Sequence, residues 1–259
     1  MLKLSKYEIR KNIGALILLL GGLGVLQIWF MVSVYAKKEG SIVGSIIVLF
    51  LYALVCFFAV FIFAVTNYYR EINSKTSYLV FMTPISPLRI ILSKMLTVLI
   101  IGVLLGGILI LLGIADINMV ADSVEEFRDI QEALNDVFRQ FGFFTGKIIF
   151  NIVFNVVSFL LAFYAHVAMV YFCITLTATL LQSSRFRALV SILFFLVLSW
   201  ARGFIQGFIT DKVPLRDTMV EVTASEIMTQ MTPYTILNLV TVVIMIAATT
   251  WLLKYRLSL

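Results

Sequence analysis

Long apolar runs separated by short charged segments are the dominant pattern of this chain. A helix crosses the hydrocarbon core of a bilayer with roughly 20 apolar residues, and six runs reach about that length. They cover, approximately, Ile13–Ala36, Ile42–Thr66, Met95–Ala115, Ile148–Leu181, Leu189–Ile209 and Tyr234–Leu253. The fourth run would be about 50 Å long as a helix, so we expect it to tilt, kink or project. The pattern predicts an all-α polytopic membrane protein with six transmembrane helices in a single transmembrane domain, residues 1–259.

The composition narrows the class of protein further. Of the 259 residues, 61% are hydrophobic and 13% are charged, whereas soluble domains carry about 25% charged residues. These values exclude a cytosolic enzyme, a disordered chain and a disulfide-linked secreted domain. Cys56 and Cys173 both lie in apolar runs, so neither a disulfide framework nor a metal site is predicted. The first run is too long for the core of a cleaved signal peptide, and we expect it to be retained.

Lysine and arginine are distributed unevenly over the segments between the runs. The side that holds both termini has twelve basic and two acidic residues, and the opposite side has eight basic and twelve acidic residues. Because basic residues are enriched on the cytoplasmic side of membrane proteins, both termini are predicted to be cytoplasmic. The net charge of +6 therefore reflects membrane orientation, and no nucleic-acid partner is predicted.

Several segments outside the runs carry helix signals. Ser/Thr-x-x-Glu strings, which are typical of helix starts, occur at Ser5–Glu8, Ser123–Glu126 and Thr223–Glu226. The first predicts a short helix at headgroup level or an ordinary basic flank. The other two lie in the predicted extracellular loops, 116–147 and 210–232. Residues 123–141 have apolar side chains at helical spacing, which predicts an amphipathic helix that packs on the spans, on the membrane surface or on a partner, or covers a substrate.

Three further features concern the turns, outer loops and helix contacts of the predicted topology. Gly40-Ser41 predicts a tight turn that makes the first two spans antiparallel neighbours. A short helix is expected from Thr223 toward Pro233. Gly102-x-x-x-Gly106 and Gly203-x-x-x-Gly207 would permit close approach of helices.

Few polar side chains lie within the runs. His166, the one histidine, is expected to bond to a neighbouring helix, and a proton-relay role would require intramembrane acids, none of which is predicted mid-span. Arg202, near the outer end of the fifth run, either extends to the headgroups or faces a translocation path. No serine forms a recognisable nucleophile motif with His166.

The cytoplasmic segment 67–94 carries most of the functional information. Arg70-Glu71 follows the second run, and residues 76–82 form a short hydrophobic segment that Thr83-Pro84 interrupts. Ser86 and Pro87 then suit the N-cap and first position of the next helix. The pattern predicts a short cytoplasmic helix held between two spans, either as a docking element for a soluble partner or as a plain interfacial loop.

This segment resembles the coupling-helix region of ABC-2 type permeases, the membrane subunits of ABC exporters. The family pattern is an acidic residue with a basic neighbour, then Thr-x-x-Leu, Pro-Ile/Val-Ser, and Gly-Lys at the start of the third span. The corresponding residues here are Arg70-Glu71, Thr76-Ser77-Tyr78-Leu79, Pro84-Ile85-Ser86 and Ser93-Lys94, with serine in place of the glycine. Six spans, cytoplasmic termini and a large outer loop between spans three and four extend the resemblance along the chain.

The resemblance implies an ABC-2 (type V exporter-like) permease fold in a bacterial plasma membrane. It implies a dimer with a second permease copy or a paralogue, and two separate ABC ATPase subunits. The residues implied to contact the ATPase are Arg70, Glu71, Thr76, Leu79, Pro84, Ile85 and Ser86. The chain has no Walker-type phosphate loop, so it is not expected to be an enzyme or to hold a cofactor; the partner ATPase would bind ATP and Mg²⁺.

Small permeases of this kind resemble peptide-toxin and bacteriocin-immunity exporters. They imply an amphipathic or antimicrobial peptide, or a related hydrophobic compound, as cargo. Export of a lipid or glycan, and a secondary transporter or channel without an ATPase, are the alternatives. Candidate substrate-path residues are Trp29, Phe30, Phe57, Phe58, Arg202 and Phe204, although aromatic side chains are equally typical of surfaces that face membrane lipid.

Overall fold

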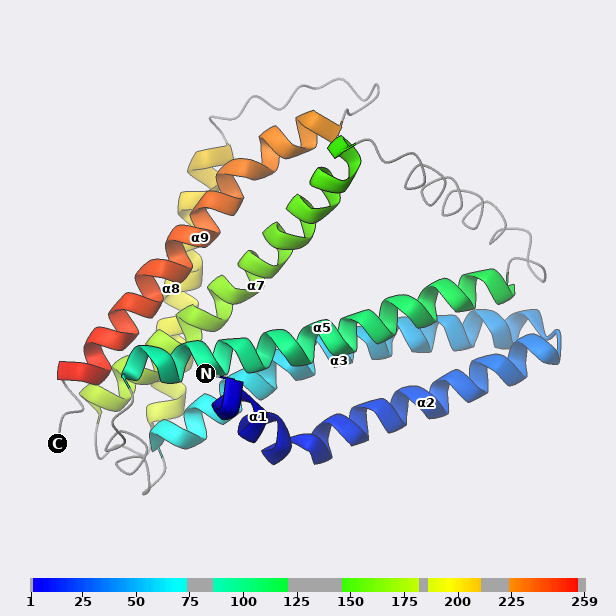
Figure 1. The fold of residues 1–259 in the computed structure, drawn as a ribbon, viewed down its shortest axis with the longest axis horizontal. Helices are drawn as coiled ribbons and strands as arrows, with labels where there is room; N and C mark the ends of the chain where they lie inside the picture. The colour runs from blue at the N-terminus through cyan, green and yellow to red at the C-terminus, as the bar shows by residue number, and fades with distance from the viewer. Residues whose placement is uncertain (1, 74–85, 121–145, 182–185, 211–223, 256–259) are drawn as a thin grey trace. The chain divides into compact units, whose positions relative to one another are not determined.

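The computed structural model describes residues 2–73, 86–120, 146–181, 186–210 and 224–255, which are almost entirely helical (Figure 1). The helices in these ranges are α1 (Leu2–Lys11), α2 (Ile13–Tyr35), α3 (Glu39–Asn73), α5 (Pro87–Val120), α7 (Gly146–Leu180), α8 (Arg187–Thr210) and α9 (Ala224–Tyr255). All of them except α1 are long and apolar enough to cross a membrane. The six predicted runs therefore correspond to six helices.

The helices extend beyond the apolar runs that predicted them. The third run was expected to cover Met95–Ala115, but α5 begins at Pro87 and ends at Val120. The charges of Lys94 and Asp116 limited the run in the sequence. In the structure both side chains have polar partners, Glu8 and Gln27 respectively, so neither charge ends the helix. Ser86 directly precedes α5, and its carbonyl accepts the first helical hydrogen bond from the Arg89 amide at 2.9 Å, as the N-cap prediction requires.

The predicted turn at Gly40-Ser41 is wrong by a few residues. The chain turns at residues 36–38, where Lys37 adopts a positive φ of 48°, and Gly40 and Ser41 already belong to α3. The Ser33 and Ser41 hydroxyl oxygens lie 2.8 Å apart and join α2 to α3. The expectation that these helices are neighbours is therefore confirmed.

The capping-box prediction at Ser5–Glu8 is also wrong. Helix α1 begins upstream of both residues, and both side chains are buried because that face of α1 packs on the start of α5. The Ser5 hydroxyl donates to the Ser93 carbonyl at 3.0 Å. Lys6, Tyr7 and Arg10 are exposed on the remaining surface of α1, so the helix has one packed face and one basic face.

At the C-terminal end of the chain, the predicted short helix that stops near Pro233 is replaced by one continuous helix. Helix α9 includes Pro233 and continues to Tyr255. Proline is tolerated inside membrane helices where neighbouring groups compensate for the missing amide. The predicted outer helix at 123–141 and the coupling residues Thr76, Leu79, Pro84 and Ile85 lie outside the described residues.

The chain divides into two compact units, and the division runs through α3 and α5. The N-terminal unit comprises Met1–Phe63 and Ser93–Phe143, and the C-terminal unit comprises Ala64–Leu92 and Phe144–Leu259. Phe30, Ile42 and Val120 form a buried cluster in the N-terminal unit. In the C-terminal unit α7 packs along α9 and α8, and this central position explains why α7 is the most buried of the six long helices.

Candidate functional sites

The last turn of α3 carries the charged pair that the coupling prediction singled out. Arg70 is exposed and Glu71 is partly exposed, two residues before the helix ends at Asn73. Ser86, on the other side of the predicted docking segment, is also exposed. Among the described residues, these three predicted contacts are therefore accessible at the two helix ends that flank residues 74–85.

Two stacked tyrosines hold the end of α3 against α7. The rings of Tyr68 and Tyr171 lie 4.0 Å apart between centroids with planes 16° apart, and both side chains are buried. The Thr175 hydroxyl donates to the Tyr171 carbonyl at 2.9 Å, so the Tyr68 hydroxyl is the donor in its 2.7 Å contact with Thr175. Tyr68 is two residues from Arg70, so the charged pair sits on a firmly packed helix end.

Arg187 makes a second connection at the same end of the C-terminal unit. It is the first residue of α8, and its guanidinium donates to the Asn73 side-chain oxygen at 3.1 Å and to the Leu181 carbonyl. This one side chain joins the last residue of α3 to the end of α7. In the sequence, Arg187 is one of the twelve basic residues that predict the membrane orientation, and nothing in its local sequence indicates these contacts.

The last two residues of the family-like pattern, Ser93 and Lys94, join α5 to α1. The Lys94 ammonium forms a buried ion pair with Glu8 of α1 at 2.9 Å. Together with the hydrogen bond from Ser5 to the Ser93 carbonyl, this pair fixes α1 on α5. The Ser93 backbone carbonyl is the acceptor of this hydrogen bond. A serine in place of the family's glycine therefore leaves the contact with Ser5 possible.

Arg202 does not extend along α8 to the headgroups; it turns toward α7 and α9. One guanidinium nitrogen lies 3.1 Å from His166 Nε2, and another donates to the Asn238 side-chain oxygen. The expectation that His166 bonds to a neighbouring helix is confirmed, and Arg202 is its partner. Asn238 was not among the predicted site residues, because a single asparagine in an apolar run carries no pattern.

A cavity of about 560 Å³ lies beside this cluster, between α7, α8 and α9. His166, Arg202 and Asn238 line it together with polar side chains that lie farther along the same helices. These are Asn155, Ser158, Gln206, Tyr234 and Thr235. The Ser158 and Thr235 hydroxyl oxygens are 2.8 Å apart and connect α7 to α9 across the cavity wall.

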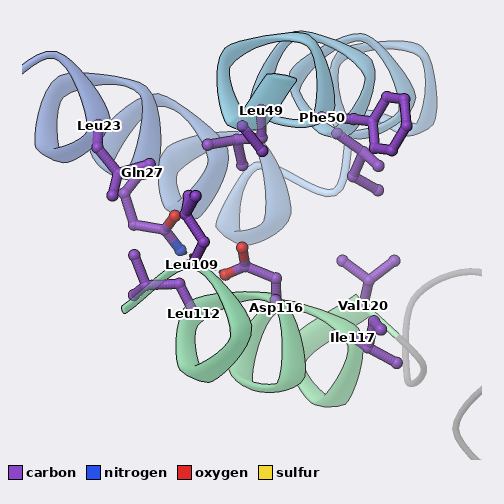
Figure 2. Close-up of a pocket in the computed structure, with 12 residues that line it drawn as sticks. Leu23, Gln27, Leu49, Phe50, Leu109, Leu112, Asp116, Ile117 and Val120 are labelled. Carbon is purple, nitrogen blue, oxygen red and sulfur yellow. Dashed lines mark hydrogen bonds between the residues drawn. The ribbon is translucent and has the colours of Figure 1, made fainter. Parts of the chain in front are cut away.

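A second cavity, of about 330 Å³, lies in the N-terminal unit and is lined almost entirely by apolar side chains from α2, α3 and α5. Figure 2 shows Gln27 of α2 and Asp116 of α5 facing each other within it. The Gln27 amide donates to the Asp116 carboxylate, and the Gln27 side-chain oxygen is buried with no partner among the residues that the structure describes. Asp116 lies four residues before the end of α5 at Val120, so it does not contradict the prediction that no acid lies mid-span.

The aromatic path candidates have different environments. Phe30 is fully buried in the core of the N-terminal unit, where it packs against Ile42 and Val120. Trp29, Phe57, Phe58 and Phe204 are exposed. No side chain or neighbouring helix among the described residues comes within 4 Å of a Cβ placed at Gly203 or Gly207.

The residues that the structure describes contain no cluster of histidine, cysteine, aspartate or glutamate that could hold a metal ion. Cys56 and Cys173 are both buried as free thiols.

Comparison with known proteins finds no matching family model, no matching curated protein and no matching solved structure. Helix length and hydropathy show what class of molecule this is: an all-α, multi-pass membrane protein with six helices that could span the bilayer.

Proposed function

We propose that this chain is the transmembrane permease subunit of a bacterial ATP-driven exporter, powered by separate ABC ATPase subunits. The observation that carries the proposal is the segment Arg70–Lys94, whose spacing of charged residues, Thr-x-x-Leu and Pro-Ile-Ser resembles the coupling region of ABC-2 permeases. In this role residues 74–85 would dock in a cleft of the ATPase, and Arg70 and Glu71 would contribute charged contacts at its edge.

The surroundings of this segment suit such a role. Both flanking helix ends belong to the C-terminal unit, where the end of α3 is joined to α7 by Tyr68 and Tyr171 and to α8 by Arg187. A displacement of the docking segment would therefore move three helices together. ATP binding can shift these helices between two conformations only if the ATPase binds one conformation more tightly than the other.

The proposed cargo is an amphipathic peptide or a related hydrophobic compound, moved out of the cell. Lipid or glycan export remains the alternative cargo for the same machine. The two cavities, each with one charged side chain in largely apolar surroundings, are compatible with an amphipathic molecule.

A transporter that works without an ATPase is the second candidate, and Asp116 is the observation that favours it. A carboxyl group in an apolar cavity can exchange a proton during transport. A proton-driven mechanism predicts that Asp116→Asn abolishes transport while ATP depletion, at a constant proton gradient, has no effect. The exporter proposal predicts that ATP depletion abolishes transport and that Asp116→Asn does not.

Affinity purification of the tagged chain from its native membrane tests the proposal. We expect a stoichiometric second polypeptide with a Walker motif, and ATP hydrolysis by the complex after reconstitution in liposomes. Purification of a fully active transporter with no nucleotide-binding chain would contradict it.

A further inference from the structure

Arg202 places a fixed positive charge far from both ends of a membrane-length helix. It lies fifteen residues after Arg187 and eight before Thr210, which is about 22 Å from one end of α8 and about 12 Å from the other. The guanidinium remains protonated at any physiological pH. A charged side chain at this depth is costly and is a functional-site candidate by default.

Neither of the two side chains that contact Arg202 is acidic. His166 Nδ1 lies 2.8 Å from the Ala162 carbonyl, and one Arg202 guanidinium nitrogen lies 3.1 Å from Nε2 and 3.5 Å from Nδ1. Asn238 contributes an amide oxygen. These contacts connect three helices, and neither of them supplies a negative charge to compensate for that of Arg202.

The charge has no carboxylate partner within the part of the chain that the structure describes. The one ion pair found there joins Glu8 and Lys94. The Arg202 Nε atom is buried, with no acceptor among the described residues. A guanidinium has five donors in a planar fork, so N–H groups beyond the two used by His166 and Asn238 remain for another acceptor.

The space beside the guanidinium is large enough for a ligand. The cavity of about 560 Å³ is within the usual range for small-molecule sites. It continues from Arg202 and His166 toward Asn155 on α7 and Met231 on α9, which the charge pattern places nearer the outer surface. Phe159, Ala162 and Leu237 provide apolar wall, and hydroxyl and amide groups provide hydrogen-bond partners.

We propose that this cavity binds the anionic group, a carboxylate or a phosphate, of an amphipathic ligand, with Arg202 as the charge partner and His166 and Asn238 as positioning residues. Arginine is suited to this task because its fork can hold two oxygens of one anion. The inference rests on the proposed function for its identification of the ligand as cargo, whereas the binding site itself requires no ATPase.

Ligand binding to the purified permease alone, in phosphatidylcholine nanodiscs, tests the site. Oleate and oleyl alcohol share one tail and differ in charge. We expect wild-type protein to bind oleate at least tenfold more tightly than oleyl alcohol, as expected for a charge-assisted contact. Equal affinities would overturn the proposal. Because no ATPase is present, this result is independent of the exporter assignment.

Two variants test whether Arg202 causes the preference for oleate over oleyl alcohol. Arg202→Gln should reduce the preference for oleate to less than about threefold, and Arg10→Gln, which removes an exposed charge on α1, should leave it unchanged. A folded Arg202→Gln protein that keeps the full preference would overturn the proposal. If this variant does not fold, photolabelling decides: a diazirine fatty acid should label Phe159, Met231 or Tyr234 in wild-type protein, and labelling confined to other helices would contradict the site.

Competition against bound oleate separates the two sources of the anionic group. Displacement by phosphatidylglycerol in the nanodisc would assign the site to a lipid headgroup. Displacement by a hydrophobic peptide with a free carboxyl terminus, but not by its amide, would assign it to a peptide. Displacement by neither class would contradict a cargo site.

Discussion

Tyr68 and Tyr171 stack face to face with ring centroids 4.0 Å apart, and the Tyr68 hydroxyl donates to Thr175 at 2.7 Å. The stack connects the last turns of α3, which carry Arg70 and Glu71, to α7, which carries His166 five residues before Tyr171. The proposed ATPase contact and the Arg202 cluster therefore lie on helices that are packed together within one unit.

The first prediction concerns this stack. Tyr68→Phe keeps the ring and removes one hydroxyl, and Thr175 retains its bond to the Tyr171 carbonyl, so we expect a loss of about 0.5–1.5 kcal/mol of stability. Tyr68→Ala removes the buried ring and should cost about 3–5 kcal/mol. Thermal unfolding in detergent ranks the stabilities of the two variants. Equal losses of stability in both would show that the ring contact is unimportant.

The second prediction concerns the charge at the end of α3. Glu71→Lys should weaken ATPase association and uncouple ATP hydrolysis from transport, because it reverses a charge at the proposed contact. Helical content and melting temperature should stay near the wild-type values, because Glu71 is only partly buried. The measurements are co-purification yield and cargo moved per ATP. Wild-type coupling in this variant would count against the assigned role, and Lys38→Glu, on the exposed turn after α2, is the matched reversal control.

The third prediction concerns the buried ion pair between α1 and α5. Glu8→Gln leaves the Lys94 ammonium buried without its counter-charge, and removal of one partner of a buried pair costs about 3–5 kcal/mol. The double variant Glu8→Leu with Lys94→Leu should recover most of that loss, since it removes both charges. Melting temperatures of the single and double variants measure the coupling. Additive losses would show that the pair does not interact.

The fourth prediction uses two adjacent glycines of α2. A side-chain carbon at Gly22 would overlap the Tyr52 hydroxyl, which is held by its hydrogen bond to the Leu19 carbonyl at 2.9 Å. Gly22→Ala should therefore destabilise the protein by about 1–3 kcal/mol. Gly21 has open space around it, so Gly21→Ala should be neutral or stabilising. A similar melting temperature for both variants would contradict the close approach of α2 and α3.

The apolar pattern predicted the fold class well because membrane helices must be about 20 residues long and apolar. It failed where a charge is satisfied by a residue distant in the sequence. Lys94 and Asp116 appeared to lie outside a span because their partners, Glu8 and Gln27, are 86 and 89 residues away. Ser5 showed a capping signal, but its hydroxyl is used for a tertiary contact with Ser93.

The candidate sites were predictable to different degrees. Arg70, Glu71 and Ser86 were proposed from a local pattern; the structure places all three at accessible helix ends, and their coupling role stays a prediction. Arg202 was noted from its position, but only the packing of α7 against α8 and α9 reveals that His166 and Asn238 are its partners. The cavity beside them forms only where α7, α8 and α9 pack together, so the sequence of any one helix does not predict it.

The most direct test of the central claim asks what contacts residue 79 inside the cell. In a chain with Cys56 and Cys173 replaced, Leu79→Cys would be modified with benzophenone maleimide in inside-out vesicles and irradiated with and without ATP. We predict a cross-link to a chain with a Walker motif, with a yield that changes when ATP is added, and no such cross-link from Lys38→Cys. Modification of Leu79→Cys only from the outside, or the absence of any cross-linked nucleotide-binding chain, would contradict the account.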